Sequence, residues 1–317
     1  MLRVRVLTAL VGIPLFLLAI LMPGGWLFAL AMCLLAGVGQ LEFARAYRRA
    51  NGEGRMAKGE GRRAENETLR LEPNPVLLVW GALLPLLVYA VVGGTPTLQD
   101  GLAGASPSIG SAGASPSNDA LQLSLLLAFA LGCLWELGRA WRCPARATAY
   151  NLGLGLFAAL YIGWLMAFAV RLRMDLAPTH LWGWQLERGA IELLWLMAML
   201  WLGDSMAYFV GRAIGRHRLA PMLSPAKSWE GTFANFACCL LLGLGGASWL
   251  GLPLWQAGLI GAGVGILGQL GDLFESSLKR AIGAKDFGGV LPGHGGVLDR
   301  FDSFLFSAPW VWWWLGQ

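Results

Sequence analysis

Long apolar stretches recur along this chain from near the N-terminus almost to Gln317. A helix needs about 20 mostly apolar residues to cross a bilayer. Only 14% of the residues are charged, whereas an ordinary soluble domain has about 25%. The sequence therefore predicts an all-α fold, a polytopic helical bundle in a membrane with about nine spans. The predicted spans are 6–22, 26–44, 75–93, 120–138, 151–170, 190–211, 232–250, 255–273 and 303–316.

The distribution of Lys and Arg predicts the orientation of this bundle. If the N-terminus is cytoplasmic, 21 of the 24 Lys and Arg residues fall in cytoplasmic segments, and the outer loops hold only Arg171, Arg173 and Arg188. Basic residues are retained on the cytoplasmic side of a membrane. We therefore expect a cytoplasmic N-terminus and an outer C-terminus. The net charge of +5 is explained by these basic loops, so no nucleic-acid partner is expected.

Two polar segments, residues 45–74 and 94–119, interrupt the apolar pattern. Neither has enough apolar residues to pack a core, so we expect a mobile cytoplasmic loop and a flexible outer loop. No separate soluble domain remains. The chain is predicted to be a single membrane domain, residues 1–317, whose chemistry lies in the membrane body and its short loops.

The carboxylates of Glu42, Glu136, Asp204 and Asp272 fall inside predicted spans. An ionised carboxylate in a span is costly, and it usually faces a bundle interior or a polar cavity. All four lie toward the predicted cytoplasmic ends of their spans, so they can meet around one cavity. For Glu42 and Glu136 the alternative is that they mark helix ends and reach water.

Asp204 and Asp272 differ from the other two because each begins a polar stripe along one helix face. The first stripe is Asp204, Tyr208 and Arg212, and the second is Asp272, Ser276, Lys279 and Arg280. A face of structural ion pairs is the alternative for either stripe.

Residues 271–303 combine carboxylates, cations and glycines in one predicted cytoplasmic segment. Carboxylates can hold Mg²⁺, which substrate phosphates then complete. Lys and Arg suit a polyphosphate, and glycines let backbone N–H groups approach it. The combination predicts phosphate chemistry with a metal. The alternative is a cytoplasmic loop whose charged side chains pair with one another and carry no chemistry. The charged residues that carry this argument are Asp272, Lys279, Arg280, Lys285, Asp286, Asp299, Arg300 and Asp302.

This segment resembles the signature of the phosphatidate cytidylyltransferase (CDP-diglyceride synthetase) family. The elements of that signature stand at fixed spacings: Ser276, Lys279-Arg280, Lys285-Asp286, Pro292, His294-Gly295-Gly296 and Asp299-Arg300-Phe301-Asp302. Residues 201–212 and 223–231 are similar to two further family segments, and His217-Arg218 stands where relatives usually have Lys-rich sequence. The resemblance covers residues 195–303, a catalytic segment that follows N-terminal spans over residues 1–194.

The resemblance implies an enzyme of phospholipid biosynthesis, a nucleotidyltransferase that joins CTP to phosphatidate and releases CDP-diacylglycerol and pyrophosphate. Its partners would be CTP, phosphatidate and the bilayer, in a bacterial inner membrane with the active site facing the cytoplasm. The attacking group would be the phosphate monoester of phosphatidate, which is largely a dianion at neutral pH and needs no protein base. Formation of a homodimer is left as an open alternative.

The resemblance also implies roles for single residues. Asp272 and Asp299 would ligate Mg²⁺, and Asp302 would be a further ligand or would support the other two. A second metal or a monovalent cation is left as an open alternative. His294 would donate a hydrogen bond to phosphate or fix the loop. The remaining expected contacts to substrate are those of Asp204, Ser224, Lys227, Ser276, Lys279, Arg280, Lys285 and Arg300.

Two other functional classes share some of these features. CTP-dependent polyprenol or phytol kinases are polytopic and use the same nucleotide, but they transfer its γ-phosphoryl group. A lipid transporter can also use buried acids, but it does not need the Gly-rich cationic loop. The glycines of Gly263-Val-Gly-Ile-Leu-Gly268 match a dinucleotide-binding pattern without the strand that it requires, so we expect them to serve close helix packing.

Overall fold

The computed structural model describes residues 2–57, 72–93, 116–142, 148–181, 184–290 and 295–315. These residues form helices and two short antiparallel hairpins. The helices are α1 (Leu2–Leu21), α2 (Trp26–Ala57), α3 (Pro75–Gly93), α4 (Pro116–Arg142), α5 (Thr148–Ala158), the π-helix η2 (Ala159–Trp164), α6 (Leu165–Arg173), α7 (Arg188–Ile214), α8 (Trp229–Leu250), α9 (Leu254–Ala281) and α10 (Leu298–Leu315). The strands are β1 (Pro178–Leu181), β2 (Trp184–Glu187), β3 (Arg218–Ala220) and β4 (Ser224–Ser228).

Seven helical segments of the described chain are long and apolar enough to cross a bilayer. They lie in α2, α3, α4, the continuous α5–η2–α6 segment, α7, α8 and α9. The chain is therefore an all-α, polytopic integral membrane protein, as the hydropathy pattern predicts. The first and last predicted spans correspond to α1, which has a shorter apolar part at Leu10–Leu21, and to α10. The count of nine spans stays a prediction.

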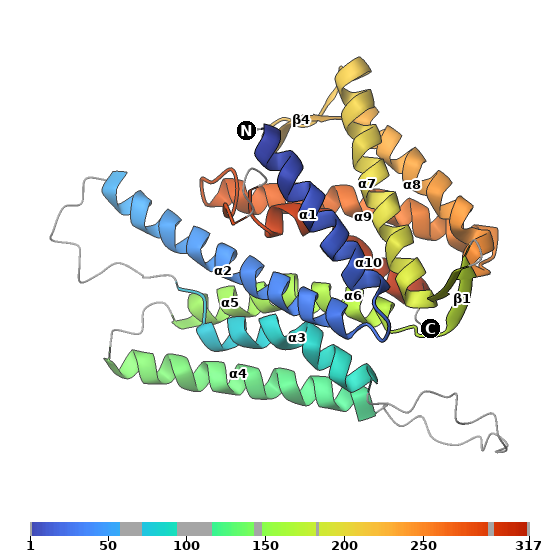
Figure 1. Cartoon of the computed structure of the whole chain (residues 1–317). Helices are drawn as coiled ribbons and strands as arrows, with labels where there is room; N and C mark the ends of the chain where they lie inside the picture. The colour runs from blue at the N-terminus through green and yellow to red at the C-terminus, as the bar shows by residue number, and fades with distance from the viewer. Residues whose placement is uncertain are drawn as a thin grey trace, which may run out of the picture.

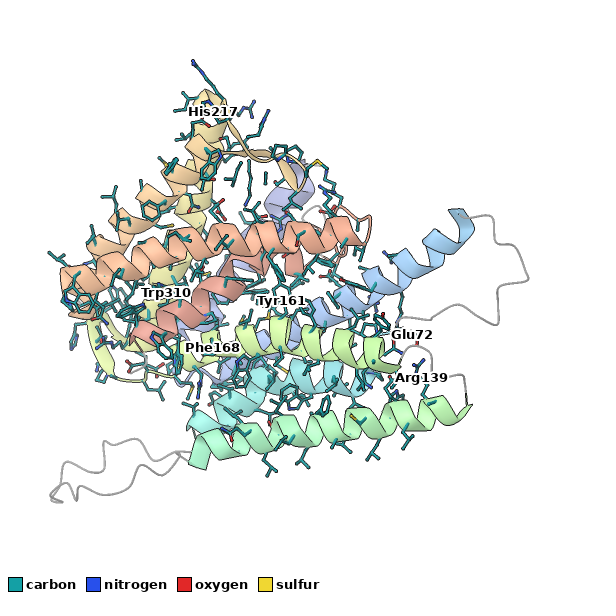
Figure 2. The ribbon with its side chains drawn as sticks, turned by 180° about the vertical axis from the view of Figure 1, so that it is seen from behind. Glu72, Arg139, Tyr161, Phe168, His217 and Trp310 are labelled. Carbon is teal, nitrogen blue, oxygen red and sulfur yellow. The ribbon has the colours of Figure 1, made fainter. Side chains whose placement is uncertain are left out.

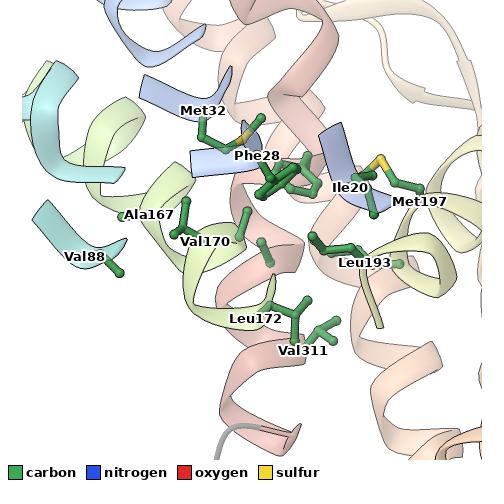
Figure 3. Close-up of a cluster of buried hydrophobic side chains, with 14 of the residues drawn as sticks. Ile20, Phe28, Met32, Val88, Ala167, Val170, Leu172, Leu193, Met197 and Val311 are labelled. Carbon is green, nitrogen blue, oxygen red and sulfur yellow. The ribbon is translucent and has the colours of Figure 1, made fainter. Parts of the chain in front are cut away.

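The helices form two groups, and α10 lies between them (Figure 1). On one side α2 packs on α3 and α3 packs on α4, while on the other side α7, α8 and α9 pack in sequence. Helix α10 lies against both α9 and α6. Figure 3 shows the apolar core between the groups, where Ile20, Phe28, Leu193 and Val311 from four different helices come together.

Glycines allow α8 and α9 to pack closely. A Cβ atom on Gly243 would lie 2.7 Å from the backbone of α9, and Gly261 faces the backbone of α8 in the same way. Gly263 lies against the indole of Trp310, inside helix α9. The interpretation of this glycine pattern as a helix-packing feature is therefore confirmed.

A buried arginine joins the C-terminal end of α1 to the rest of the bundle. Arg173 is fully buried, and its Nε and Nη2 atoms each lie 2.7 Å from a carbonyl oxygen, those of Ile20 and Met22. Its guanidinium also pairs with Glu187 at 2.6 Å. The last carbonyls of a helix lack partners within it, so Arg173 completes α1 and fixes its position.

Helix α2 is longer than the hydropathy pattern predicts, because it continues to Ala57 and so occupies the first part of the predicted loop 45–74. The extension is rich in Arg and Ala, which favour helices even where apolar residues are few. Helix α4 likewise starts at Pro116, inside the predicted loop 94–119. The rest of these two predicted loops lies outside the described residues.

Candidate functional site

A cavity of about 880 Å³ opens between α7, α9 and the β3–β4 hairpin, at the end of α7 where Figure 2 places His217. This volume is within the usual range for small-molecule sites, about 300–1,000 Å³. We call it the polar cavity. Its lining residues with polar side chains are Asp204, Tyr208, Arg212, Arg218, Lys227, Ser228, Thr232, Gln269 and Asp272.

The predicted residues Asp204, Lys227 and Asp272 meet in the polar cavity. Lys227 Nζ lies 2.6 Å from Asp272, and it also donates to Gln269 Oε1 at 3.3 Å. Ser276 Oγ donates to Asp272 Oδ1 at 3.4 Å. The side chain of Ser276 therefore orients a carboxylate.

Three cationic side chains, those of Arg212, Arg218 and Lys227, line the polar cavity. Arg212 Nη1 donates to the hydroxyl of Tyr208 at 2.8 Å, one turn earlier on the same face of α7. Arginine suits phosphate because its planar fork donates two parallel hydrogen bonds. The cavity thus combines cations for an anionic ligand with carboxylates at its base.

A second cavity, of about 340 Å³, lies beside the first between α1, α2, α7 and α10. We call it the apolar cavity because mainly apolar side chains line it, including those of Ile13, Phe16 and Leu200. Arg300 and Asp302 also belong to its wall. Asp204 borders both cavities, so one carboxylate stands where the two spaces meet.

Asp299 lies at the start of α10 and is nearly enclosed, with 4% of its side chain exposed. Its Oδ1 atom lies 3.0 Å from Lys279 Nζ, and its Oδ2 atom accepts the backbone N–H groups of Phe287 and Gly296. Through the two backbone hydrogen bonds Asp299 ties both described ends of the α9–α10 loop, residues 282–290 and 295–297, to α10.

Lys279 is placed between two carboxylates. Its Nζ atom lies 2.9 Å from Glu275 and 3.0 Å from Asp299, and it is not among the residues that line either cavity. We expected Lys279 to bind phosphate. In the structure Lys279 contacts Asp299 and the fully buried Glu275. Phosphate binding by Lys279 stays a prediction.

The other predicted residues lie around this centre. Arg280 is exposed and donates to the carbonyl oxygens of Leu223 and Ala284, next to Ser224 at the start of β4. Lys285 is exposed on the α9–α10 loop and lines neither cavity. His294 lies outside the described residues.

Of the four carboxylates expected around one cavity, only Asp204 and Asp272 line the polar cavity. Glu42 and Glu136 are both buried, so neither reaches water at a helix end. Glu136 pairs with Arg139 at 2.9 Å and accepts from Asn74, at the α3–α4 contact away from the site. Glu42 contacts the α9–α10 loop instead.

Some residues of the site carried no clear signal in the sequence. Gln269 lines the polar cavity one turn before Asp272, and Asn235 donates to Asp204 Oδ1 at 3.2 Å from α8. For Gln269 the one signal was its helical spacing from Asp272 in the same span. Asn235 lies in α8, whose predicted span 232–250 contains no acidic residue from which to count. Arg218 was noticed only as a departure from the family's Lys-rich pattern.

Carboxylates at the base of the site offer oxygen ligands to a metal. Within the described residues no three His, Cys, Asp or Glu side chains gather closely enough to form a finished metal cage. Gly271 lies against the backbone of Asp302, so Asp272 and Asp302 stand on facing turns of α9 and α10, where a positive charge near them is favourable. Lys227 supplies one such charge at Asp272. The donor set fits Mg²⁺, which keeps several waters and needs few protein ligands.

Comparison with known proteins identifies the family. Residues 104–316 match the model of the cytidylyltransferase family. A phosphatidate cytidylyltransferase of Synechocystis sp. is 31% identical over 325 residues, which cover 97% of this chain and 94% of that protein. This chain belongs to the cytidylyltransferase family.

Shorter alignments to relatives in the family agree. A phosphatidate cytidylyltransferase of Bacillus subtilis is 37% identical over 51% of this chain and 57% of its own length. One from Staphylococcus epidermidis is 44% identical over 39% of this chain and 48% of its own length. Membership of the family makes this protein a nucleotidyltransferase and confirms the resemblance drawn from the signature.

Proposed function

We propose that this enzyme transfers the cytidylyl group of CTP to phosphatidate, forming CDP-diacylglycerol and pyrophosphate. The observation that carries the proposal is the pair of adjoining cavities, one polar and cationic and the other apolar, with Asp204 at their boundary. A water-soluble polyphosphate suits the first cavity. A lipid with a phosphate headgroup suits the second, whose wall combines apolar side chains with Arg300.

In the proposed reaction a phosphate oxygen of phosphatidate attacks the α-phosphorus of CTP, and the bond between the α-phosphorus and the α–β bridging oxygen breaks. Pyrophosphate leaves, and no proton has to be moved. The protein's task is to position two anions and to neutralise charge on the leaving group. Arg212, Arg218 and Lys227 supply that charge from the polar cavity, with Arg280 and Lys285 nearby on the α9–α10 side.

Mg²⁺ would be held by Asp272, with Asp299 and Asp302 from the first turns of α10. When bound, the ion would neutralise charge on the phosphates. Asp299 has three hydrogen-bond donors around it, and a carboxylate offers about four acceptor positions, so one position remains for a metal. Lys279 then orients Asp299, and Ser276 orients Asp272.

We further propose nine spans with a cytoplasmic N-terminus, α1 and α10 being the spans beyond the seven long apolar helices. The charge distribution supports this orientation, because it assigns 21 of the 24 Lys and Arg residues to the cytoplasmic side. The polar cavity would then open to the cytoplasm of a bacterium, where CTP is made.

Product analysis tests the reaction. Purified protein in vesicles that contain phosphatidate and a polyprenol receives CTP labelled at the α- or the γ-phosphorus. We expect the α-label in the lipid and the γ-label in pyrophosphate. A γ-label in the lipid would instead identify a lipid kinase, and no lipid label at all would favour a transporter. The Asp272→Asn variant serves as the inactive control.

A further inference from the structure

Glu42 contacts the start of α10 from a distant part of the chain. Its Oε2 atom accepts the backbone N–H of Val297 at 2.7 Å and that of Leu298 at 3.3 Å. The first N–H groups of a helix have no partner within it, and side-chain acceptors that fill this role normally come from a neighbouring residue. Here the acceptor is supplied 255 residues earlier, by α2.

Two glycines of the α9–α10 loop fit around this carboxylate. A Cβ atom on Gly296 would lie 2.7 Å from Glu42 Oε2, and one on Gly288 would overlap Glu42 Oε1. Glu42 is 2% exposed. The carboxylate therefore fills the space between the two ends of the loop, and both ends are shaped to admit it.

The neighbouring residue of α2 contacts the same loop. The ring of Phe43 lies 5.9 Å from that of Phe287, and both side chains are buried. Asp299 joins the two ends of the loop from the other direction, through the N–H groups of Phe287 and Gly296. Two carboxylates thus accept four backbone N–H groups. Asp299 of α10 accepts those of Phe287 and Gly296, and Glu42 of α2 accepts those of Val297 and Leu298.

We propose that Glu42 is a positioning residue, which fixes the first turn of α10 and thereby the geometry of Asp299 and Asp302. Glu42 borders neither cavity, so it acts through these residues and not on a substrate. Without its carboxylate, two buried N–H groups lose their acceptor. The start of α10 and the α9–α10 loop then spend part of the time displaced from the arrangement that presents both aspartates.

Amide hydrogen exchange tests the contact without any need for activity. In lipid nanodiscs, the amides of Val297 and Leu298 should be protected in the unmodified protein. They should exchange about 10- to 150-fold faster in Glu42→Ala, the range for losing a hydrogen bond to a charged group. Glu42→Gln keeps one oxygen acceptor and should stay within about tenfold of the unmodified protein. Unchanged exchange in Glu42→Ala overturns the proposal.

Magnesium dependence tests the consequence for the site, and this arm rests on the proposed function. If only a fraction of the molecules holds the aspartates in place, the apparent metal affinity falls by that fraction. Glu42→Ala should then need about 10- to 150-fold more Mg²⁺ for half-maximal synthesis of CDP-lipid, with much of kcat recovered at high Mg²⁺. Glu42→Gln should restore most of the affinity.

Glu136→Gln is the matched control, because Glu136 is an equally buried carboxylate in a different helix. It should change neither the exchange of Val297 and Leu298 nor the Mg²⁺ requirement. Faster exchange in Glu42→Ala with an unshifted Mg²⁺ requirement overturns the positioning role. If the unmodified protein makes no CDP-lipid, the proposed function fails, while the exchange measurement still decides whether Glu42 holds the loop.

Discussion

At the scale of single residues, the carboxylates of the site differ in what neutralises them. Asp272 faces the polar cavity and pairs with Lys227, which itself lines that cavity. Asp299 is enclosed and pairs with Lys279. A charge pair at a cavity wall can be opened by an incoming ligand, whereas an enclosed pair is part of the folded structure. We therefore expect different consequences when the two lysines or the two aspartates are replaced.

Asp272→Asn should lower the synthesis of CDP-lipid by more than about 100-fold, since the loss of groups that merely support a metal ligand already costs about 10- to 100-fold. A neutral amide is a much poorer ligand for Mg²⁺. Initial rates in phosphatidate vesicles at saturating Mg²⁺ measure this. A near-normal rate in a variant that inserts normally would remove Asp272 from the proposed metal site.

Lys279→Met should mainly destabilise the protein, because it leaves Glu275 and Asp299 buried without their common cation. Breaking a buried ion pair by removing one partner costs about 3–5 kcal/mol. Thermal unfolding in detergent should show a lower Tm, while Arg216→Met, at an exposed side chain, should leave the Tm unchanged. A variant with normal Tm and lost activity would return Lys279 to the phosphate-binding role first expected for it.

The sequence predicts which charged residues matter better than it predicts their partners. Spacing along one helix face indicated that Asp204 and Asp272 belong to polar stripes, and the structure brings both to one cavity. It did not indicate that Lys279 would point to Asp299, because that contact depends on how α9 and α10 are rotated. Glu42 was harder still, since its partners are backbone groups at the other end of the chain.

At the scale of helices and hairpins, the apolar pattern predicts the long helices well because a bilayer requires continuous runs of apolar residues. It predicts their ends less well, as the continuation of α2 to Ala57 shows, because a helix outside the lipid needs no apolar residues. The hairpins were not predicted. Each strand has at most five residues, which is too short for an alternating pattern to stand out.

The close contact between α8 and α9 makes a prediction at this scale. Gly261→Ala places a methyl group against the backbone of α8, and overpacking of this kind typically costs about 1–3 kcal/mol. The Tm should fall accordingly. Gly245→Ala is the control within α8, because no atom lies within 4 Å of its added Cβ. Equal Tm values for the two variants would show that the α8–α9 contact is looser than the structure indicates.

At the scale of the whole molecule, the two hairpins lie at opposite ends of α7 (Figure 1). The β3–β4 hairpin borders the polar cavity, and the β1–β2 hairpin adjoins the opposite end, near Arg173 and Glu187. Because α7 is one of the seven helices that are long and apolar enough to cross a bilayer, we expect the hairpins to lie on the two sides of the membrane. They therefore offer labelling sites for the proposed orientation.

A single cysteine at Met222 or at Trp184, two exposed side chains, tests that orientation in a background without the native cysteines. An impermeant thiol reagent added to intact cells should label the Trp184→Cys variant at once. It should label Met222→Cys only after permeabilisation, because the polar cavity is proposed to open to the cytoplasm. The reverse pattern would overturn both the proposed orientation and the proposal that CTP enters the polar cavity from the cytoplasm.

The contact of Glu42 with the α9–α10 loop also bears on how such a protein can be divided and recombined. The stretch that matches the family begins at residue 104, and residues 1–93 would then look like an exchangeable anchor. Glu42 and Phe43 lie within residues 1–93, yet they contact the α9–α10 loop, which leads to Asp299 at the start of α10. A chimera with foreign N-terminal helices of equal hydropathy would still insert into the bilayer. It would keep the normal Mg²⁺ requirement only if the donor also brought a side-chain acceptor that fits between Gly288 and Gly296.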